Sequence, residues 1–154
     1  MKNLTKIHWK DGKNFSADFI LFQHYSKINY ADYIGKYDNF SLGRKKRKKD
    51  YVSLGLAFDI ETTSMLVDDE KTAFVYHWQL GIGNDCFYGR ELKEVVEVFD
   101  KLSDMFYPRR VICWVHNFSY EYGFLIEYMK FEHIFATAKH KPIYAEYKNI
   151  EFRC

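Results

Sequence analysis

Residues 58–63 have the sequence Phe-Asp-Ile-Glu-Thr-Thr and end an apolar segment that begins at Val52. In a β-strand, residues i and i+2 point to the same side, so Asp59 and Glu61 would project together while their apolar neighbours pack behind them. Two carboxylates held this close raise each other's pKa unless a cation lies between them. Mg²⁺ and Mn²⁺ prefer oxygen ligands, so the pair is a candidate metal site, although an isolated Asp-x-Glu also suits an ordinary solvent-facing strand.

A second polar pair lies in residues 113–125, which have the sequence Cys-Trp-Val-His-Asn-Phe-Ser-Tyr-Glu-Tyr-Gly-Phe-Leu. The pattern predicts a short buried strand, a turn and a helix. Asn117 and Glu121 are four residues apart, a spacing that places two side chains on one face of a helix. A polar pair at the start of a helix that follows a strand is well placed to meet the first site. We interpret His116 as a residue that shapes the turn rather than as a catalytic base.

Together, in this order and about sixty residues apart, the two elements resemble the Exo I and Exo II motifs of the DEDD superfamily of 3′–5′ exonucleases. The sequence Asp-Ile-Glu-Thr-Thr, followed by His-Asn-x-x-Tyr-Glu-x-x-Phe-Leu, is most similar to the proofreading domain at the N-terminus of family B DNA polymerases. The protein-primed polymerases of phages and linear plasmids are the most similar branch. The resemblance spans residues 51–154, which is two-thirds of the chain.

This resemblance implies two-metal hydrolysis of the 3′-terminal phosphodiesters of single-stranded DNA, with Mg²⁺ or Mn²⁺ as the metal. Asp59 would bridge both ions, and Glu61 and Glu121 would bind or orient one of them. The remaining matched residues would hold the frayed 3′ end of the primer strand: Thr62, Asn117 and Tyr120. The resemblance also implies a terminal protein as a partner of the complete polymerase.

The chain departs from the family pattern in two places. Glu121 occupies a position that is commonly Asp in the superfamily. The family also completes its site with a third motif, in which a Tyr lies four residues before an Asp, and no Asp follows Asp104 here. We therefore expect an N-terminal part of a DNA polymerase that ends before the third motif and the polymerase domain. We also expect weak or no nuclease activity from this chain alone.

The hydrophobic pattern from residue 50 onward predicts an α/β domain. Alternating or continuously apolar runs predict strands, and apolar residues three and four apart predict helices. The expected strands are 51–61, 72–82, 85–88, 111–115, 143–147 and 150–154, and the expected helices are 91–107 and 119–129. Lys148-Asn149 is a plausible tight hairpin turn between the last two strands. This order matches the ribonuclease H-like fold, a mixed sheet flanked by helices on its faces.

We expect two parts in the chain: residues 1–50 as an N-terminal extension with some helix, and residues 51–154 as the exonuclease-like domain. The extension ends in a basic linker, Arg44-Lys-Lys-Arg-Lys-Lys49. Such a run could neutralise several phosphates and make nucleic-acid binding dependent on salt, or it could be a solvated linker.

Composition is that of an ordinary globular chain. It has 154 residues, 47% of them apolar and 29% charged, and a net charge of +2. No apolar run is as long as a membrane span and the N-terminus lacks the pattern of a signal peptide, so we expect a cytoplasmic protein of a virus or plasmid. Three scattered cysteines imply no disulfide framework, and the six histidines show no zinc spacing with them.

Two other kinds of function stay open. One is a non-catalytic module that binds single-stranded nucleic acid through the basic linker and neighbouring aromatic residues, without any need for metal. The other is a protein-interaction module built on a nuclease-like scaffold. The aromatic-rich residues 1–50 favour this last alternative, and their deletion would abolish partner binding.

Overall fold

The structure is a computed structural model of the chain. It describes residues 5–8, 16–19, 22–44, 48–139 and 141–154. Residues 45–47, in the middle of the expected basic linker, lie outside the described residues.

Most of the described chain forms one mixed β-sheet. Its strands are β3 (Phe22–His24), β4 (Asn39–Leu42), β5 (Lys49–Val67), β6 (Glu70–Ile82), β7 (Asp85–Gly89), β8 (Arg110–Val115), β9 (Glu132–Ala138), β10 (Lys141–Tyr147) and β11 (Ile150–Arg153). Among the described residues, the order is β3-β7-β6-β5-β8-β11-β10-β9, and β4 pairs with β5 beside this path. β8 is parallel to both β5 and β11, whereas β6 is antiparallel to its neighbours β5 and β7.

The other described elements are helices and a separate two-stranded ribbon. The α-helices are α1 (Leu92–Phe106) and α2 (Phe118–Leu125), the 3₁₀ turns are η1 (Tyr25–Lys27) and η2 (Tyr30–Tyr33), and β1 (Thr5–His8) and β2 (Ser16–Phe19) form a separate antiparallel ribbon. Neither α-helix of the described chain combines the length and the apolar character that crossing a membrane requires.

The predicted α/β class is confirmed, and every strand and helix expected after residue 50 is present. The largest differences lie at β5 and β6, which run on to Val67 and back from Glu70 instead of stopping near the first motif. The sequence did not predict β9, because all its residues are exposed and no buried face imposes an alternating pattern. β3 and β4 belong to the predicted N-terminal extension, yet they pair with β7 and β5 in the main sheet.

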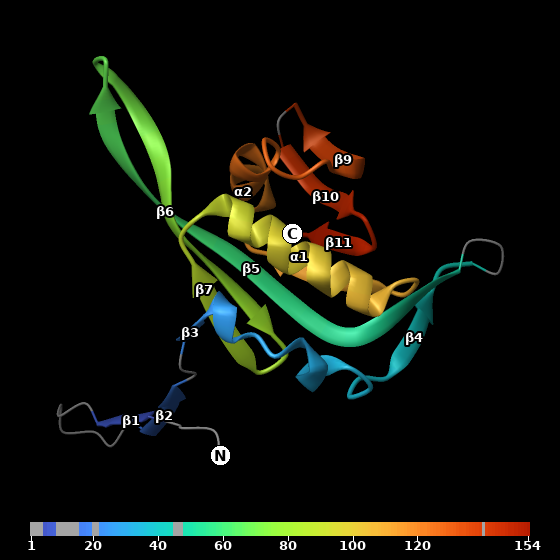
Figure 1. The fold of residues 1–154 in the computed structure, drawn as a ribbon. Helices are drawn as coiled ribbons and strands as arrows, with labels where there is room; N and C mark the ends of the chain where they lie inside the picture. Colours follow the sequence, from blue (N-terminus) through green and yellow to red (C-terminus); the bar gives the residue numbers. More distant parts are fainter. Residues whose placement is uncertain (1–4, 9–15, 20–21, 45–47, 140) are drawn as a thin grey trace.

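One face of the sheet packs against α1 (Figure 1). The buried side of α1 contains Val95, Val98, Phe99, Leu102 and Phe106. Phe99 meets Phe58 of β5 edge-on, with ring centroids 5.7 Å apart, and also contacts Phe152 of β11 at 5.0 Å. Phe152 in turn stacks on Phe118 of α2 at 5.7 Å, so α2 lies on the same side of the sheet as α1.

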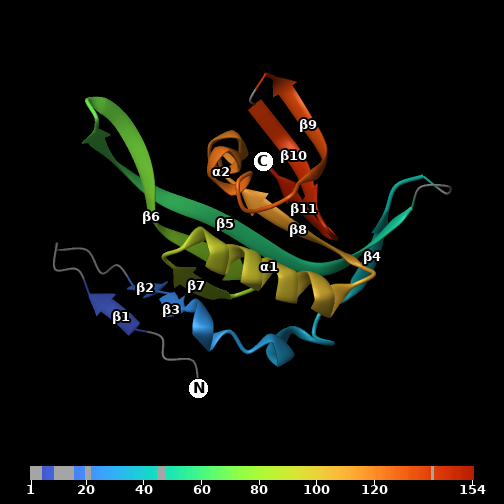
Figure 2. The same ribbon diagram turned by 45° about the horizontal axis from the view of Figure 1, so that its top comes forward.

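The opposite face of the sheet has no helix over it in the described part of the chain (Figures 1 and 2). Strand alternation turns Ser53, Gly55 and Ala57 toward this face, and all three are exposed. The expectation that helices flank both faces is therefore wrong for the described residues. The small side chains on β5 leave this surface flat and open.

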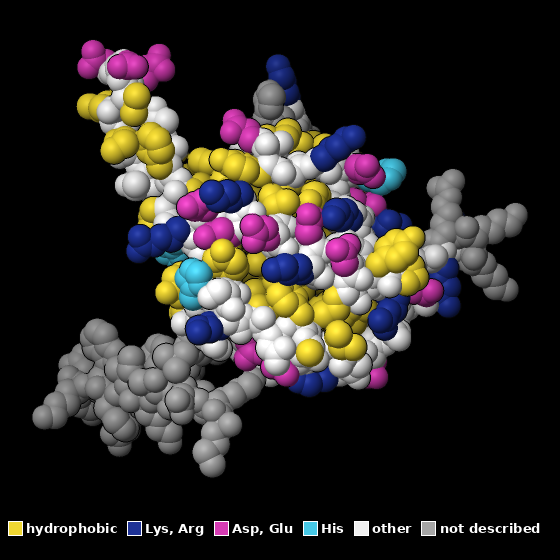
Figure 3. Space-filling model, in the orientation of Figure 1, with side chains coloured by type: hydrophobic (Ala, Val, Ile, Leu, Met, Phe, Trp, Pro, Cys, Tyr) yellow, Lys and Arg dark blue, Asp and Glu magenta, His cyan; other side chains and the backbone are white. Residues whose placement is uncertain are grey.

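A two-stranded projection, the β-arm (residues 62–75), extends from the sheet where β5 and β6 continue past their other neighbours (Figure 1). Asp68 and Asp69 form its turn with φ of +50° and +63°, the backbone conformation that two-residue hairpin turns require. Acidic side chains gather at its end and apolar side chains lie behind them (Figure 3). Met65 and Leu66 are among its exposed apolar residues.

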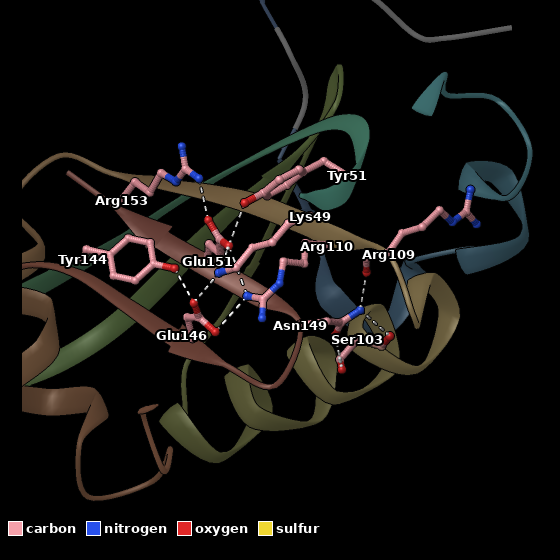
Figure 4. A network of polar contacts seen from close by, with 10 residues as sticks. All are labelled: Lys49, Tyr51, Ser103, Arg109, Arg110, Tyr144, Glu146, Asn149, Glu151 and Arg153. Atoms are coloured by element: carbon pink, nitrogen blue, oxygen red, sulfur yellow. Dashed lines mark hydrogen bonds and ion pairs between the residues drawn. The ribbon is translucent and has the colours of Figure 1, made fainter. Parts of the chain in front are cut away.

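The β10–β11 hairpin buries a charged network on the sheet (Figure 4). Glu146 and Glu151 are directly opposite each other, a pairing that is unfavourable for two like charges. Lys49 Nζ compensates both, at 2.8 Å from Glu146 Oε1 and 3.1 Å from Glu151 Oε1. Arg110 bridges the same two carboxylates, and Arg153 pairs with Glu151. Lys49, the last residue of the expected basic linker, thus stabilises the fold.

The same network shifts the pKa of Glu146. Burial alone would raise this pKa, but hydrogen bonds from Lys49, Tyr144 and Arg110 outweigh burial and lower it to about 2. At the hairpin turn, the Asn149 amide donates to the backbone oxygens of Ser103 and Arg109, at 3.1 and 2.7 Å. These bonds attach the predicted Lys148-Asn149 turn to the end of α1 and the start of β8 (Figure 4).

We expect Glu151→Gln to lower the free energy of unfolding by about 3 kcal/mol, because removal of the buried carboxylate leaves three partly buried cations, Lys49, Arg110 and Arg153, without full compensation. Glu132→Gln is the control, since Glu132 lies opposite Glu146 on β9 and is exposed. Urea denaturation of both variants at neutral pH measures the difference. Equal stabilities of the two variants would show that the network contributes nothing.

Candidate functional site

The two polar motifs meet because β8 is shorter than β5. The parallel pairing of β5 with β8 ends at Phe58 and Val115. The chain then turns and enters α2, which lies beside the part of β5 that follows Phe58. Thr62 Oγ1 and the Tyr120 hydroxyl are 2.6 Å apart and form a hydrogen bond between the two motifs.

Asp59 and Glu121 form the centre of the candidate site. Their carboxyl groups interact directly, through a side-chain hydrogen bond and through charge. Glu121 is only 3% exposed, and its Oε2 atom has no hydrogen-bond partner among the described residues. A buried carboxylate oxygen without a partner is costly, so this atom is available to a ligand that supplies positive charge.

The surroundings raise the pKa of Glu121 to about 7. Burial is the largest cause, and the charge of Asp59 and the hydrogen bond with it act in the same direction. A large fraction of Glu121 is therefore protonated near neutral pH. A divalent cation would displace that proton, and an oxygen donor set of this kind fits Mg²⁺ or Mn²⁺.

Glu61 does not complete a cluster with this pair. It is half-buried and lies directly opposite His77 of β6. The Cα atoms of residues i and i+2 in a strand are about 6.6 Å apart. Glu61 is therefore next to Asp59 along β5, beside the pair formed by Asp59 and Glu121. In the part of the chain that the structure describes, no group of three His, Cys, Asp or Glu side chains could hold a metal ion.

The residues that are predicted to hold the DNA strand lie next to the carboxylate pair. Asn117 precedes the first residue of α2, is exposed, and makes no capping hydrogen bond with its side chain. Tyr120 is 41% exposed and meets Phe124 edge-on, with ring centroids 5.2 Å apart. His116 is exposed, and its backbone oxygen accepts a hydrogen bond from Cys154 Sγ at 3.2 Å. Asn117 and Tyr120 thus have polar atoms at the surface beside Glu121.

None of the acids that follow Glu121 supplies a third carboxylate to the pair. Glu127 and Glu132 are exposed. Glu146 and Glu151 are buried in the ion-pair network on the other side of β8. The absence of a third motif in the sequence therefore has a counterpart in the described structure.

The sequence did not point to two residues beside the site. The register of β5 with β6 places Gln79 opposite Asp59 and His77 opposite Glu61. The two side chains contact each other, with Gln79 Nε2 3.0 Å from His77 Nε2. No sequence signal identifies them, because their proximity depends on the strand register.

Comparison of the chain with protein-family models, curated protein sequences and solved structures finds no match.

We expect the raised pKa of Glu121 to make stability depend on pH. The folded state holds this proton more tightly than the unfolded state, so the contribution is fully present below the ordinary value of 4.5 and is lost as the pH rises to about 7. Glu121→Gln keeps the shape of the side chain and cannot ionise. Between about pH 5 and pH 8, the wild type should lose roughly 2 kcal/mol of unfolding free energy relative to this variant.

Urea denaturation at several pH values in the presence of a chelator measures this difference. Glu127→Gln is the matched control, because Glu127 is exposed and lies just after α2. A stability difference between wild type and Glu121→Gln that stays constant over the whole pH range would contradict the assigned pKa.

Proposed function

We propose that this chain is a 3′–5′ exonuclease domain of a DNA polymerase, with Mg²⁺ or Mn²⁺ as cofactor and a single-stranded DNA 3′ end as substrate. The observation that supports it best is the interaction of Asp59 with Glu121, whose buried Oε2 atom has no hydrogen-bond partner in the described part of the chain. These acids come from motifs about sixty residues apart. Their meeting is what the resemblance to the DEDD exonucleases requires.

The topology is consistent with this proposal. The central order β7-β6-β5-β8-β11, with β6 antiparallel to its neighbours and α1 between β7 and β8 in the chain, agrees with a ribonuclease H-like arrangement. Asp59 lies on the central strand β5, and Glu121 lies on the helix that follows β8. We therefore propose the ribonuclease H-like fold together with the function.

The residues divide the work as follows. Asp59 and Glu121 would hold the divalent cation, and Glu61 would orient water or metal from its neighbouring position. Bound divalent ions would supply Lewis acidity to the phosphodiester and would activate the attacking water. The hydroxyls of Thr62 and Tyr120, already joined to each other, would position the sugar or phosphate of the last nucleotide. The exposed Asn117 amide would donate a hydrogen bond to the same DNA strand.

We expect metal binding to depend on both central carboxylates. Asp59→Asn and Glu121→Gln should each weaken Mn²⁺ binding at least about tenfold, because each removes an anionic oxygen ligand. Glu127→Gln should bind Mn²⁺ as the wild type does. The loss of the free Mn²⁺ signal in electron paramagnetic resonance gives the affinity. Equal affinity in all four proteins would remove the basis of the proposed site.

We expect this chain to hydrolyse DNA weakly or not at all, because no third carboxylate joins the pair among the described residues. Incubation of a 5′-labelled single strand with Mg²⁺ or Mn²⁺ tests this expectation. Any metal-dependent shortening should disappear in Asp59→Ala. Shortening that persists in this variant would contradict the assignment of the site.

The described residues contain no three-carboxylate group, which also favours a second candidate, a non-catalytic module that binds single-stranded nucleic acid. Such a module would bind the strand in the presence of a chelator and with a steep salt dependence. The exonuclease domain would instead hold the 3′ end more tightly when the cation is present.

A further inference from the structure

A pocket of about 570 Å³ adjoins the candidate site, a size suited to a small organic group. We call it the aromatic pocket. Its lining residues come from β3, β6 and β7 and from the residue after β7: Phe22, Tyr76, His77, Gln79, Tyr88 and Arg90.

The strand register places this pocket beside the candidate carboxylates. Gln79 is directly opposite Asp59, and His77 is directly opposite Glu61. Side chains that face each other across two antiparallel strands have Cβ atoms about 5 Å apart on the same face. Tyr88 is opposite Gln79 on the next strand and so lies two strands, about 10 Å, from Asp59. The polar wall of the pocket is thus the immediate neighbour of Asp59 and Glu61.

A β-bulge adds a second aromatic wall. The register shifts between Glu61 and Thr62, whose partners are His77 and Val75, so Tyr76 has no residue opposite it. In a regular strand, Tyr76 and His77 would point to opposite faces. A bulge re-aims side chains, and here both residues line the pocket with their rings in edge contact at 4.9 Å.

The lining suits a planar heterocycle that is attached to an anion. Phe22 and Tyr76 are 55% and 49% exposed, so their rings are accessible for stacking. Tyr88 is held by an edge contact with His24 at 5.6 Å. The Gln79 amide has further donor and acceptor capacity for a base edge beyond its contact with His77.

The charge of the residues that line the pocket also suits a base that carries a phosphate. Arg90 is exposed and carries the positive charge of the lining, and none of the described residues that line the pocket is acidic. An exposed guanidinium is well suited to a phosphate oxygen. A base with its phosphate therefore matches both the rings and the charge.

We propose that the aromatic pocket binds an unpaired nucleobase of the same strand whose terminal phosphodiester lies at Asp59 and Glu121. This inference rests on the proposed function. The base of the last or next-to-last nucleotide would lie against the rings of Tyr76 and Tyr88, and Arg90 would contact an adjoining phosphate. The pocket would hold the unpaired end in place while the carboxylates face the bond to be cleaved.

Affinity for a short fluorescent thymidine oligonucleotide, measured by anisotropy with a chelator present, tests the proposal without the metal. Tyr88→Leu should weaken binding about tenfold through the loss of one base stack, whereas Tyr88→Phe should retain it. Arg90→Gln should weaken binding and reduce the dependence of log affinity on log salt by about one unit. Phe135→Ala, an exposed aromatic on β9 at the far edge of the sheet, is the control.

Photo-crosslinking identifies the contact directly. An oligonucleotide with 5-iodouracil next to its 3′ end should form its adduct on Tyr76 or Tyr88, as located by mass spectrometry. Adducts confined to other residues, or wild-type affinity in both Tyr88→Leu and Arg90→Gln, would overturn the pocket. If Asp59→Asn loses Mn²⁺ binding while Tyr88→Leu and Arg90→Gln keep wild-type DNA affinity, the proposed pocket alone is refuted. A Tyr88 adduct without Mn²⁺ binding would refute the proposed function alone.

Discussion

The pairing of β8 with only the first half of β5 is the constraint on which the rest of the arrangement depends. β5 is the long central strand, and β8 accompanies it only as far as Phe58. The edge that β8 leaves is taken by α2, and the contacts from Asp59 to Glu121 and from Thr62 to Tyr120 follow. A β8 that paired further along β5 would keep α2 away from this edge and separate the two motifs.

The two pairs of acidic side chains differ in how far neighbouring cations compensate their charge. Glu146 and Glu151 are buried opposite each other, and Lys49, Arg110 and Arg153 compensate them, so the cluster is structural. Among the described residues, Asp59 and Glu121 have no salt-bridge partner, and the Oε2 atom of Glu121 has no hydrogen-bond partner. A fold that surrounds one pair with cations and leaves the other uncompensated is consistent with an external cation at the second pair.

Sequence reasoning predicted what depends on local pattern and missed what depends on register. The alternation that ends at Ile60 and the buried face of α1 predicted the central elements, because each has one face in the core. β9 has no buried face and gave no signal. The family resemblance indicated the meeting of Asp59 with Glu121, and among the described residues no third His, Cys, Asp or Glu side chain forms a metal-holding group with them.

The aromatic pocket shows the same limit of sequence reasoning. Tyr76, His77 and Tyr88 come together through a bulge and a strand register, and neither is visible as a motif. Lys49 is a further case, since it belongs to a basic run in the sequence but to a buried ion-pair network in the fold. The structural role of a charged run or of an aromatic residue therefore becomes clear only when the register of the strands is known.

The most direct test of the central claim is the pKa of Glu121, measured by carbon-detected NMR of its carboxyl group with and without Mg²⁺. We expect a pKa of about 7 in the metal-free protein. Saturating Mg²⁺ should lower it by at least about one unit, because the cation competes with the proton for the same oxygen. A pKa that stays near 4.5, or one that Mg²⁺ does not change, would contradict a cation site shared by Asp59 and Glu121.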